Sequence, residues 1–220
     1  MPLKNPGEIN KNKLPAMTIV RSFSQFLKEG AIAVDQASAS QKAANFVSIL
    51  QKYLGKKEEG NNRGDMVISF LKKTGLGPGY PWCMAFVYSM FDELTGGTNP
   101  LPKTAGVVDH WRKVPAGVAK ITRAQAIQDP TLVKPGQVFF KSRSGGGHTG
   151  IVLKVEGMNF ISIDGNSSDQ VKLNKYTIDS TSTLGFADYF QSPEFSVSLA
   201  TAVEPMIASS AISLGGGKEV

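Results

Sequence analysis

The stretch GYPWCMAFVYSMF, residues 79–91, contains the single cysteine of the chain, Cys83. Pro81 disfavours a helical conformation at the residue before it, so a helix in this stretch begins at or after Pro81, and Cys83 falls in its first turn. The free backbone N–H groups and the helix dipole stabilise a thiolate there. Because the residues that follow are almost all apolar, a buried structural cysteine is the alternative that this stretch alone leaves open.

Helices are expected before this stretch. The apolar residues of 42–54 recur at three- and four-residue spacing and predict a helix that ends at Gly55. A second helix is expected over 65–75, with Asp65 as its N-cap and Gly75 at its C-terminal end.

Strands are expected after Pro135, where the sequence changes to short runs rich in Val, Ile, Phe and Tyr that are separated by Gly, Asn and Ser. The runs are 136–142, 148–156, 159–165 and 170–178. Two short helices, over 104–114 and 121–130, are expected just before them. Helices followed by consecutive strands predict an α+β fold with an antiparallel sheet.

The chain is expected to divide into three parts. Residues 1–41 are polar and mixed, and we interpret them as an N-terminal arm with a short helix over 20–30 and a linker, DQASASQ, at 35–41. Residues 42–191 are expected to form the core domain. Residues 192–220 are mostly small and show no persistent periodicity, which predicts a low-complexity tail that is flexible or depends on a partner.

The charge of the chain bears on its partners. A formal net charge of +6 over 220 residues favours polyanions such as nucleic acid, an anionic membrane or a bacterial cell wall. The basic residues are scattered and do not interleave with aromatic residues, which argues against nucleic acid. One cysteine excludes an intramolecular disulfide and a multi-thiolate metal site.

The sequence also bears on localisation. The first 30 residues contain no secretory signal, and no apolar segment reaches the length of a membrane span. We therefore expect synthesis in the cytoplasm, with any export independent of a cleavable N-terminal signal.

The chain has two histidines, and their settings differ. His148 lies in SGGGHTGIVLKV, where a glycine-rich loop delivers it to the start of a strand. Glycines around a residue allow close approach of a ligand or another side chain, which favours His148 as a general base. His110 lies in VVDHWRK beside Trp111 and is expected at the surface or as a packing residue.

A candidate acceptor for a histidine follows one strand later, in ISIDGNSSD. Asp164 and Asn166 are two residues apart, so their side chains point the same way. A cysteine nucleophile needs a histidine, and the histidine needs such an acceptor to hold its ring. The alternative is a turn that closes a hairpin. A calcium loop is a weaker alternative, because Asp169 stands where a glycine should follow and the terminal acidic ligand is missing.

A cysteine at a helix N-terminus, followed in order by KPGQVFF, GHTGIV and DGN, resembles the CHAP amidase/peptidase family. The segment EGNNRGDMVISFLKKTGLGPGYPWCMAFVYSMF resembles a bacterial and phage branch of that family, and the resemblance extends over residues 59–190. It implies a papain-like fold, shared with the NlpC/P60 enzymes, in which the nucleophile helix packs on an antiparallel sheet that carries the base. It also implies peptidoglycan as the substrate.

The resemblance implies roles for individual residues. Cys83 matches the nucleophile and His148 the general base. Asp164 stands where relatives commonly have Glu, and Asn166 matches the family's Asn; either could orient the imidazole, and the sequence leaves both open. Tyr80 is expected to line the site and help hold an oxyanion.

The neighbouring Trp82 is expected at the same substrate or oxyanion position. The implied chemistry is attack of the Cys83 thiolate on an amide carbonyl, formation of a thioester and its hydrolysis by water, with no metal or organic cofactor needed. The bond could be the amide between muramic acid and L-alanine or a peptide bond of the stem or cross-bridge. Both remain open.

Two other classes of function remain as alternatives. The chain could be a wall-binding or structural module that has lost turnover, or an intracellular amidase that acts on a small peptide conjugate. Delivery to the wall could occur as a phage lysin at lysis, as part of a phage tail or injection machine, or as a secreted effector. The two terminal segments, 1–41 and 192–220, are candidates for docking to such machinery.

Overall fold

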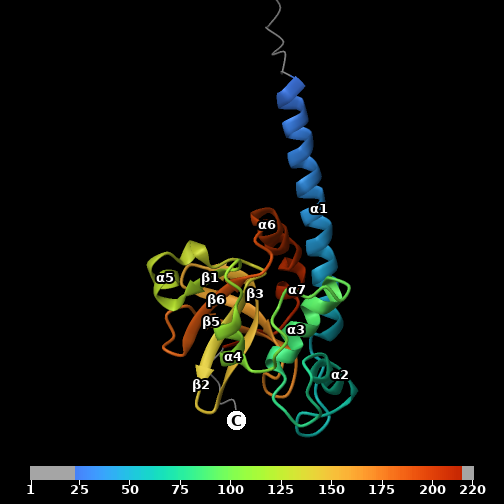
Figure 1. Ribbon diagram of the computed structural model, residues 1–220, viewed down its shortest axis with the longest axis vertical. Helices are drawn as coiled ribbons and strands as arrows, with labels where there is room; N and C mark the ends of the chain where they lie inside the picture. Colours follow the sequence, from blue (N-terminus) through green and yellow to red (C-terminus); the bar gives the residue numbers. More distant parts are fainter. Residues whose placement is uncertain (1–22, 215–220) are drawn as a thin grey trace, which may run out of the picture. The chain divides into compact units, whose positions relative to one another are not determined.

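The computed structural model describes residues 23–214 (Figure 1). The helices are α1 (Phe23–Tyr53), α2 (Asp65–Lys73), α3 (Cys83–Leu94), α4 (Val107–Lys113), α5 (Arg123–Gln128), the 3-10 helix η1 (Pro130–Leu132), α6 (Pro193–Ala202) and α7 (Glu204–Ala208). The strands are β1 (Ala119–Thr122), β2 (Val138–Arg143), β3 (Gly146–Glu156), β4 (Asn159–Asp164), β5 (Lys172–Thr177), β6 (Thr183–Asp188) and β7 (Ser213–Leu214). The expected α+β fold is confirmed.

The strands form one sheet in the order β1-β6-β2-β3-β4-β5-β7. Strands β1 to β6 pair antiparallel, and the short β7 pairs with β5 in parallel. Lys141 of β2 lies opposite His148 of β3, and Ile151 of β3 lies opposite Ile163 of β4. Because side chains alternate along a strand, this register places His148 and Asp164 on the same face of the sheet.

The two faces of the sheet have different cores. One face packs against α1, α2, α3, α6 and α7 in the larger core, which includes Phe86, Phe140, Ile151 and Ile163. The other face carries a smaller apolar cluster that includes Phe139, Phe160, Tyr176 and Phe186, with Ala126 of α5. His148 and Asp164 belong to this second face, so apolar residues surround a polar site there.

Helix α1 corrects the expectation of a linker at 35–41, because it runs through these residues without interruption. The stretch consists of Asp, Gln, Ala and Ser without Gly or Pro, so no residue in it breaks a helix. Ala39 is buried, and the Ser40 hydroxyl lies 3.2 Å from that of Ser198 in α6. Of the described residues, 36–214 belong to one compact unit and 23–35 to another.

Helices α6 and α7 differ from the expected flexible tail. The Ser192 hydroxyl caps α6 by accepting a hydrogen bond from the backbone N–H of Phe195. Phe195, Leu199 and Val203 follow at four-residue spacing and lie buried in the larger core. Because these few large apolar residues lie among small ones, the sequence shows little helical periodicity. The helix is therefore recognised only from its packing in the structure. Residues 1–22 of the arm expected over 1–41, and residues 215–220 of the expected tail, lie outside the described part of the chain.

Most other expected elements are confirmed within a few residues. Gly55 and Gly75 have positive φ values of 78° and 87° and follow the helices that they were expected to end. Asp65 is the first residue of α2 and Gly64 is its N-cap, so the expectation of an Asp65 cap is wrong by one position. Strands β1, β6 and β7 were not predicted.

His110 is a packing residue and not a surface residue. Its ring is fully buried against Phe140, and its Nε2 hydrogen-bonds the Tyr189 hydroxyl at 2.7 Å. Burial lowers the pKa of His110 to about 4, although the charge of Asp109 opposes this shift. His110 is therefore neutral at physiological pH.

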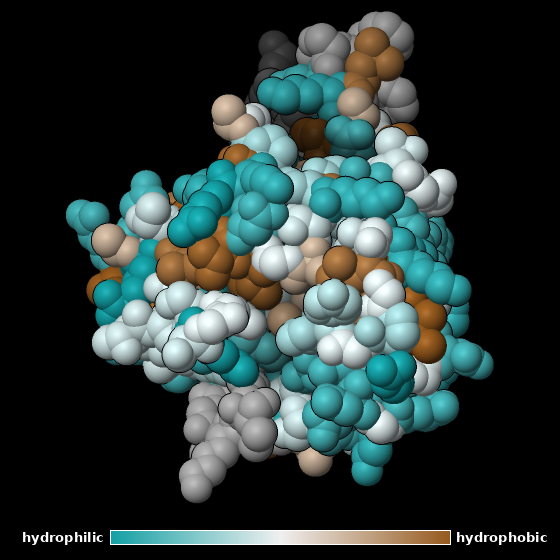
Figure 2. All heavy atoms as spheres, turned by 60° about the horizontal axis from the view of Figure 1, so that its bottom comes forward, coloured by the Kyte–Doolittle hydropathy of each residue, from teal (hydrophilic) through white to brown (hydrophobic). Residues whose placement is uncertain are grey.

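The face in Figure 2 is mostly hydrophilic, and its apolar side chains are exposed in small patches between polar ones. None of the described helices combines the length and the apolar character that a membrane span requires. Among the large apolar residues that are exposed, Tyr80 has 53% of its surface accessible and lies beside Cys83.

Candidate active site

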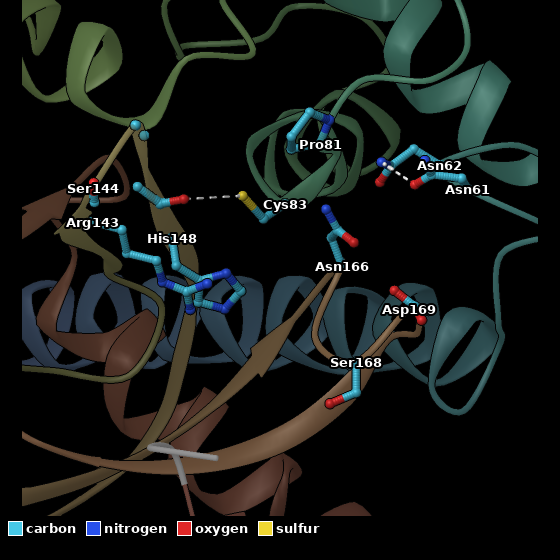
Figure 3. A pocket seen from close by; sticks show the side chains of 13 residues that line it. Asn61, Asn62, Pro81, Cys83, Arg143, Ser144, His148, Asn166, Ser168 and Asp169 are labelled. Atoms are coloured by element: carbon cyan, nitrogen blue, oxygen red, sulfur yellow. Dashed lines mark hydrogen bonds between the residues drawn. The ribbon is translucent and has the colours of Figure 1, made fainter. Parts of the chain in front are cut away.

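Cys83 is the first residue of α3, as its position after Pro81 predicts. Trp82 is the N-cap, with a φ of −119° and a ψ of 12°, and no side chain caps the helix. The Cys83 thiol lies 3.9 Å from the backbone carbonyl oxygen of Gly147, which precedes His148 at the start of β3 (Figure 3). The sulfur is therefore carried by the first turn of α3, where the backbone N–H groups have no partner within the helix.

His148 is buried on β3 between Asp164 and Cys83. Its Nε2 lies 3.0 Å from Oδ2 of Asp164, and Cys83 is near enough to raise the pKa of the ring. Since Nε2 faces the carboxylate, Nδ1 is the ring nitrogen available to the thiol. This is the order of thiol, imidazole and carboxylate that a cysteine nucleophile requires.

The pKa of His148 reflects these partners. Burial alone lowers it, but the hydrogen bonds and charges of Asp164 and Cys83 raise it from 6.5 to about 9. The imidazole is therefore protonated at neutral pH. A protonated imidazole beside Cys83 is placed to give a proton to a group that leaves from this site.

Asp164, and not Asn166, contacts the imidazole. Asp164 is fully buried at the end of β4, and Oδ2 also accepts hydrogen bonds from Asn174 Nδ2 at 2.8 Å and Tyr176 OH at 2.7 Å. Asn166 lies beyond the strand with a φ of 54°, and it lines the cleft with its amide on the Cys83 side (Figure 3). Its position fits contact with a bound substrate better than orientation of the ring.

The cleft around Cys83 has two lobes that share Pro81, Cys83 and the glycines of 145–147. The first lobe has a volume of about 430 Å³ and is polar; its other lining residues are Asn61, Asn62, Arg143, Ser144, His148, Asn166, Ser168 and Asp169. The second has a volume of about 450 Å³; its other lining residues are Thr74, Leu76, Tyr80, Lys103, Thr104, Ala105, Gly106, Val107 and Lys113. A chain bound across Cys83 could therefore occupy both sides.

Two loops form the polar wall of the first lobe. The Glu58 backbone N–H donates to the Asp169 carbonyl at 2.9 Å, and the Val171 N–H donates to the Lys56 carbonyl at 2.9 Å. Asn62 and Asp169 are among four lining residues with φ between 52° and 61°; the others are Asn166 and Ser168. Positive φ is uncommon outside glycine, and its concentration here is typical of a functional site.

Tyr80 and Trp82 have different positions. Tyr80 lines the second lobe, as expected of a substrate contact. Trp82 is fully buried, and its Nε1 donates to Glu58 Oε2 at 2.7 Å. Its expected role at the substrate or oxyanion is therefore wrong for the side chain, which anchors α3 to the loop that carries Asn62.

Two glycines of the quoted motifs are required by close packing. A Cβ at Gly165 of DGN would lie 2.7 Å from the Phe86 ring of α3 and 2.9 Å from the Trp82 ring. A Cβ at Gly150 of GHTGIV would overlap Oδ1 of Asp164 and lie 2.6 Å from the Ile163 carbonyl oxygen. Because Gly165 has no side chain, β4 can end directly against α3. Because Gly150 has no side chain, the Asp164 carboxylate can lie directly over β3.

Gly150→Ala is therefore expected to displace the Asp164 carboxylate from His148. A displacement near 1 Å in an active site costs up to about 100-fold in rate, and we expect a fall in kcat of that order. The measurement is steady-state cleavage at 25 °C, with circular dichroism to verify folding. Gly117→Ala is the matched control, because a Cβ at Gly117 meets no atom within 4 Å. Wild-type kcat in folded Gly150→Ala would contradict the prediction.

Several site residues were missed by sequence reasoning: Glu58, Asn61, Asn62, Arg143, Ser162, Asn174 and Tyr176. For the strand residues a signal existed. Ser162 and Asp164 alternate with apolar residues in β4, and Asn174 and Tyr176 lie two apart in β5. Polar side chains that lie on the same face of two neighbouring strands can hydrogen-bond one another. The strand register is needed to tell whether they do lie on the same face.

Across residues 23–214, no group of three or more His, Cys, Asp or Glu side chains could hold a metal ion. Asp164, the residue common to the catalytic and calcium alternatives, directs both carboxylate oxygens to buried donors of the protein.

The site therefore combines a thiol on a helix, a buried histidine on an antiparallel sheet and a carboxylate partner for that histidine. Residues 75–166 match the family model of the CHAP domain, and the matched segment includes Cys83, His148, Asp164 and Asn166. This match confirms the resemblance inferred from the order of the motifs. No curated protein matches the chain.

Proposed function

We propose that the protein is a cysteine hydrolase that cleaves an amide bond in the peptide part of bacterial peptidoglycan. The observation that carries the proposal is the buried His148, bonded to Asp164 and adjacent to Cys83 at the base of an open cleft. The match to the CHAP domain supports a hydrolase of the amidase or peptidase type.

The first half of the proposed reaction is acyl transfer to sulfur. The Cys83 thiolate attacks the amide carbonyl carbon, a C–S bond forms, and the C=O electron pair moves to the oxygen. The oxyanion accepts a hydrogen bond from the backbone N–H of Cys83, and one such donor stabilises the transition state by about 3 kcal/mol. Tyr80 is proposed to contribute from the second lobe. The C–N bond then breaks as His148 gives its Nδ1 proton to the leaving amine.

The second half is hydrolysis of the thioester. His148 is now neutral and takes a proton from a water molecule, which attacks the acyl carbon. The C–S bond breaks, the carboxylate product leaves, and the thiolate–imidazolium pair is restored. Asp164 holds the ring through both steps and stabilises its charged form.

The charges of the cleft fit an anionic peptide. The first lobe contains Arg143 and Asp169, and the second contains Lys103 and Lys113, of which Lys113 is paired with Asp109. Cations therefore outnumber carboxylates around Cys83, in keeping with the net charge of +6. How the protein reaches the wall, whether at lysis or through a phage tail or secretion machine, stays a prediction.

The test is release of new amine groups and soluble fragments from purified peptidoglycan, with fragments identified by mass. We expect release by the wild type and none by Cys83→Ala, which removes only the sulfur. The fragment masses distinguish cleavage between muramic acid and L-alanine from cleavage within the stem or cross-bridge.

Two other outcomes would contradict the proposal in different ways. No release by a wild type whose thiol reacts readily with iodoacetamide would indicate another amide substrate. No release together with an unreactive thiol would indicate a wall-binding module that lacks turnover.

A further inference from the structure

Asp164 has more hydrogen-bond donors than a histidine partner alone requires. Ser162, Asn174 and Tyr176, which we call the Asp164 cradle, all donate to its carboxylate and are all buried. Ser162 bonds Oδ1 at 2.7 Å, whereas Asn174 and Tyr176 bond Oδ2, the oxygen that His148 also uses. Three donors therefore share one oxygen in a fully buried site.

Tyr176 is the member of the cradle that also contacts a cation, Lys141. Its phenol stays protonated because burial and the Asp164 charge raise its pKa, so its O–H is a permanent donor. The Lys141 amine lies over the Tyr176 ring, 4.3 Å from the ring centroid. A cation over the ring withdraws electron density and strengthens the phenol as a donor.

We propose that Tyr176 is a positioning residue that draws negative charge away from Asp164 Oδ2 and so limits how tightly His148 holds its proton. This inference rests on the proposed hydrolase function. An imidazolium beside an unshared carboxylate would hold its proton strongly and transfer it slowly to the leaving amine. The two cradle donors on Oδ2 share its negative charge and so weaken it as an acceptor for His148.

The charged and titratable groups near the pair come from three directions. Strand β2 contributes Lys141 and Arg143, which share the face of His148. Strand β5 contributes Tyr176 and also Lys172, whose amine bonds Ser168 at the surface. Helix α3 contributes Cys83. Because the Tyr176 hydroxyl bonds the same carboxylate oxygen as His148, its loss acts directly on the His148–Asp164 pair.

The direction of the effect follows from this arrangement. In Tyr176→Phe, Oδ2 loses a donor and becomes a stronger acceptor for His148, so the pKa of His148 rises. A hydrogen bond to a charged group contributes enough to shift the pKa by about one unit. Activity requires the imidazolium and is lost as the pH rises through its pKa, so the alkaline limit should move upward by about one unit. We expect kcat at pH 7.5 to fall about tenfold with KM within about twofold.

The experiment combines kinetics with a direct titration. The pH dependence of kcat is measured for wild type and Tyr176→Phe, and the His148 ring is titrated by NMR. The chain has only two histidines, so His110→Gln leaves His148 as the only imidazole signal. Tyr189→Phe is the matched control, because it also removes a buried phenol hydroxyl, whose partner is His110. It should leave the alkaline limit and the His148 titration unchanged.

The outcomes separate this inference from the proposed function. A higher His148 pKa and a higher alkaline limit in Tyr176→Phe support it, and Lys141→Met should shift both in the same direction by a smaller amount. An unchanged or lower His148 pKa in a folded Tyr176→Phe variant would overturn it. If the wild type cleaves no peptidoglycan, the proposed function fails, while the NMR titration still decides whether Tyr176 sets the His148 pKa.

Discussion

His148→Gln is expected to lower kcat by about 1,000-fold or more, because His148 both stabilises the thiolate and gives a proton to the leaving amine. Glutamine has a similar reach but cannot carry a proton. Asp164 then keeps the three donors of its cradle but loses its cationic partner. The measurement is kcat for peptidoglycan cleavage, together with the rate of Cys83 alkylation by iodoacetamide, which should also fall.

His110→Gln is the matched control for this variant. It makes the same substitution at the other histidine, which is buried against Phe140 and Tyr189 and lies outside the cleft. We expect near wild-type kcat from the folded protein at pH 7.5. Equal losses of kcat in the two variants would mean that the substitution lowers activity by disturbing the fold. Activity retained in His148→Gln would exclude His148 as the proton donor.

Trp82→Ala is expected to lower the free energy of unfolding by about 4 kcal/mol, the usual cost of removing a large buried aromatic side chain. The indole packs beside Phe70 and against Gly165, and its Nε1 donates to Glu58. Truncation leaves a cavity under the N-terminus of α3 and leaves the Glu58 carboxylate without this donor. Urea denaturation followed by circular dichroism measures the change.

Tyr80→Ala is the control for stability, since Tyr80 is two residues away and more than half exposed. Substitutions at such positions usually change stability by less than about 0.5 kcal/mol. If Trp82→Ala were as stable as Tyr80→Ala, the indole would not anchor α3. If Trp82→Ala stayed folded but bound substrate poorly, the result would support the earlier expectation that Trp82 contacts the substrate.

The parts of the site that depend on local sequence could be predicted. Pro81 and the apolar run after it fix the start of α3 at Cys83, because both act within a few residues. The glycines before His148 and the Asp-Gly-Asn turn identify two strand ends that meet in the sheet. Which of Asp164 and Asn166 reaches the ring could not be predicted, since this depends on where β4 ends and on a φ of 54° at Asn166.

The parts that depend on distant contacts could not be predicted. Residues 35–41 are helical partly because α6, more than 150 positions away, packs on them. Trp82 is adjacent to Cys83 in sequence, but its side chain points into the core, where it donates a hydrogen bond to Glu58 and packs against Phe70. The role of Tyr176 depends on strand register, which places it on the same face as His148 and not on the opposite one.

Helices α6 and α7 also bear on how this domain could be transplanted. The family match ends at residue 166, and it begins at residue 75. A chimera cut at those positions would lack Phe46 and Leu50 on one side and Phe195 and Leu199 on the other, all of which fill the same core. The unit that could be exchanged between proteins as a working module therefore runs from about residue 36 to about residue 210, with flanking segments that family boundaries leave out.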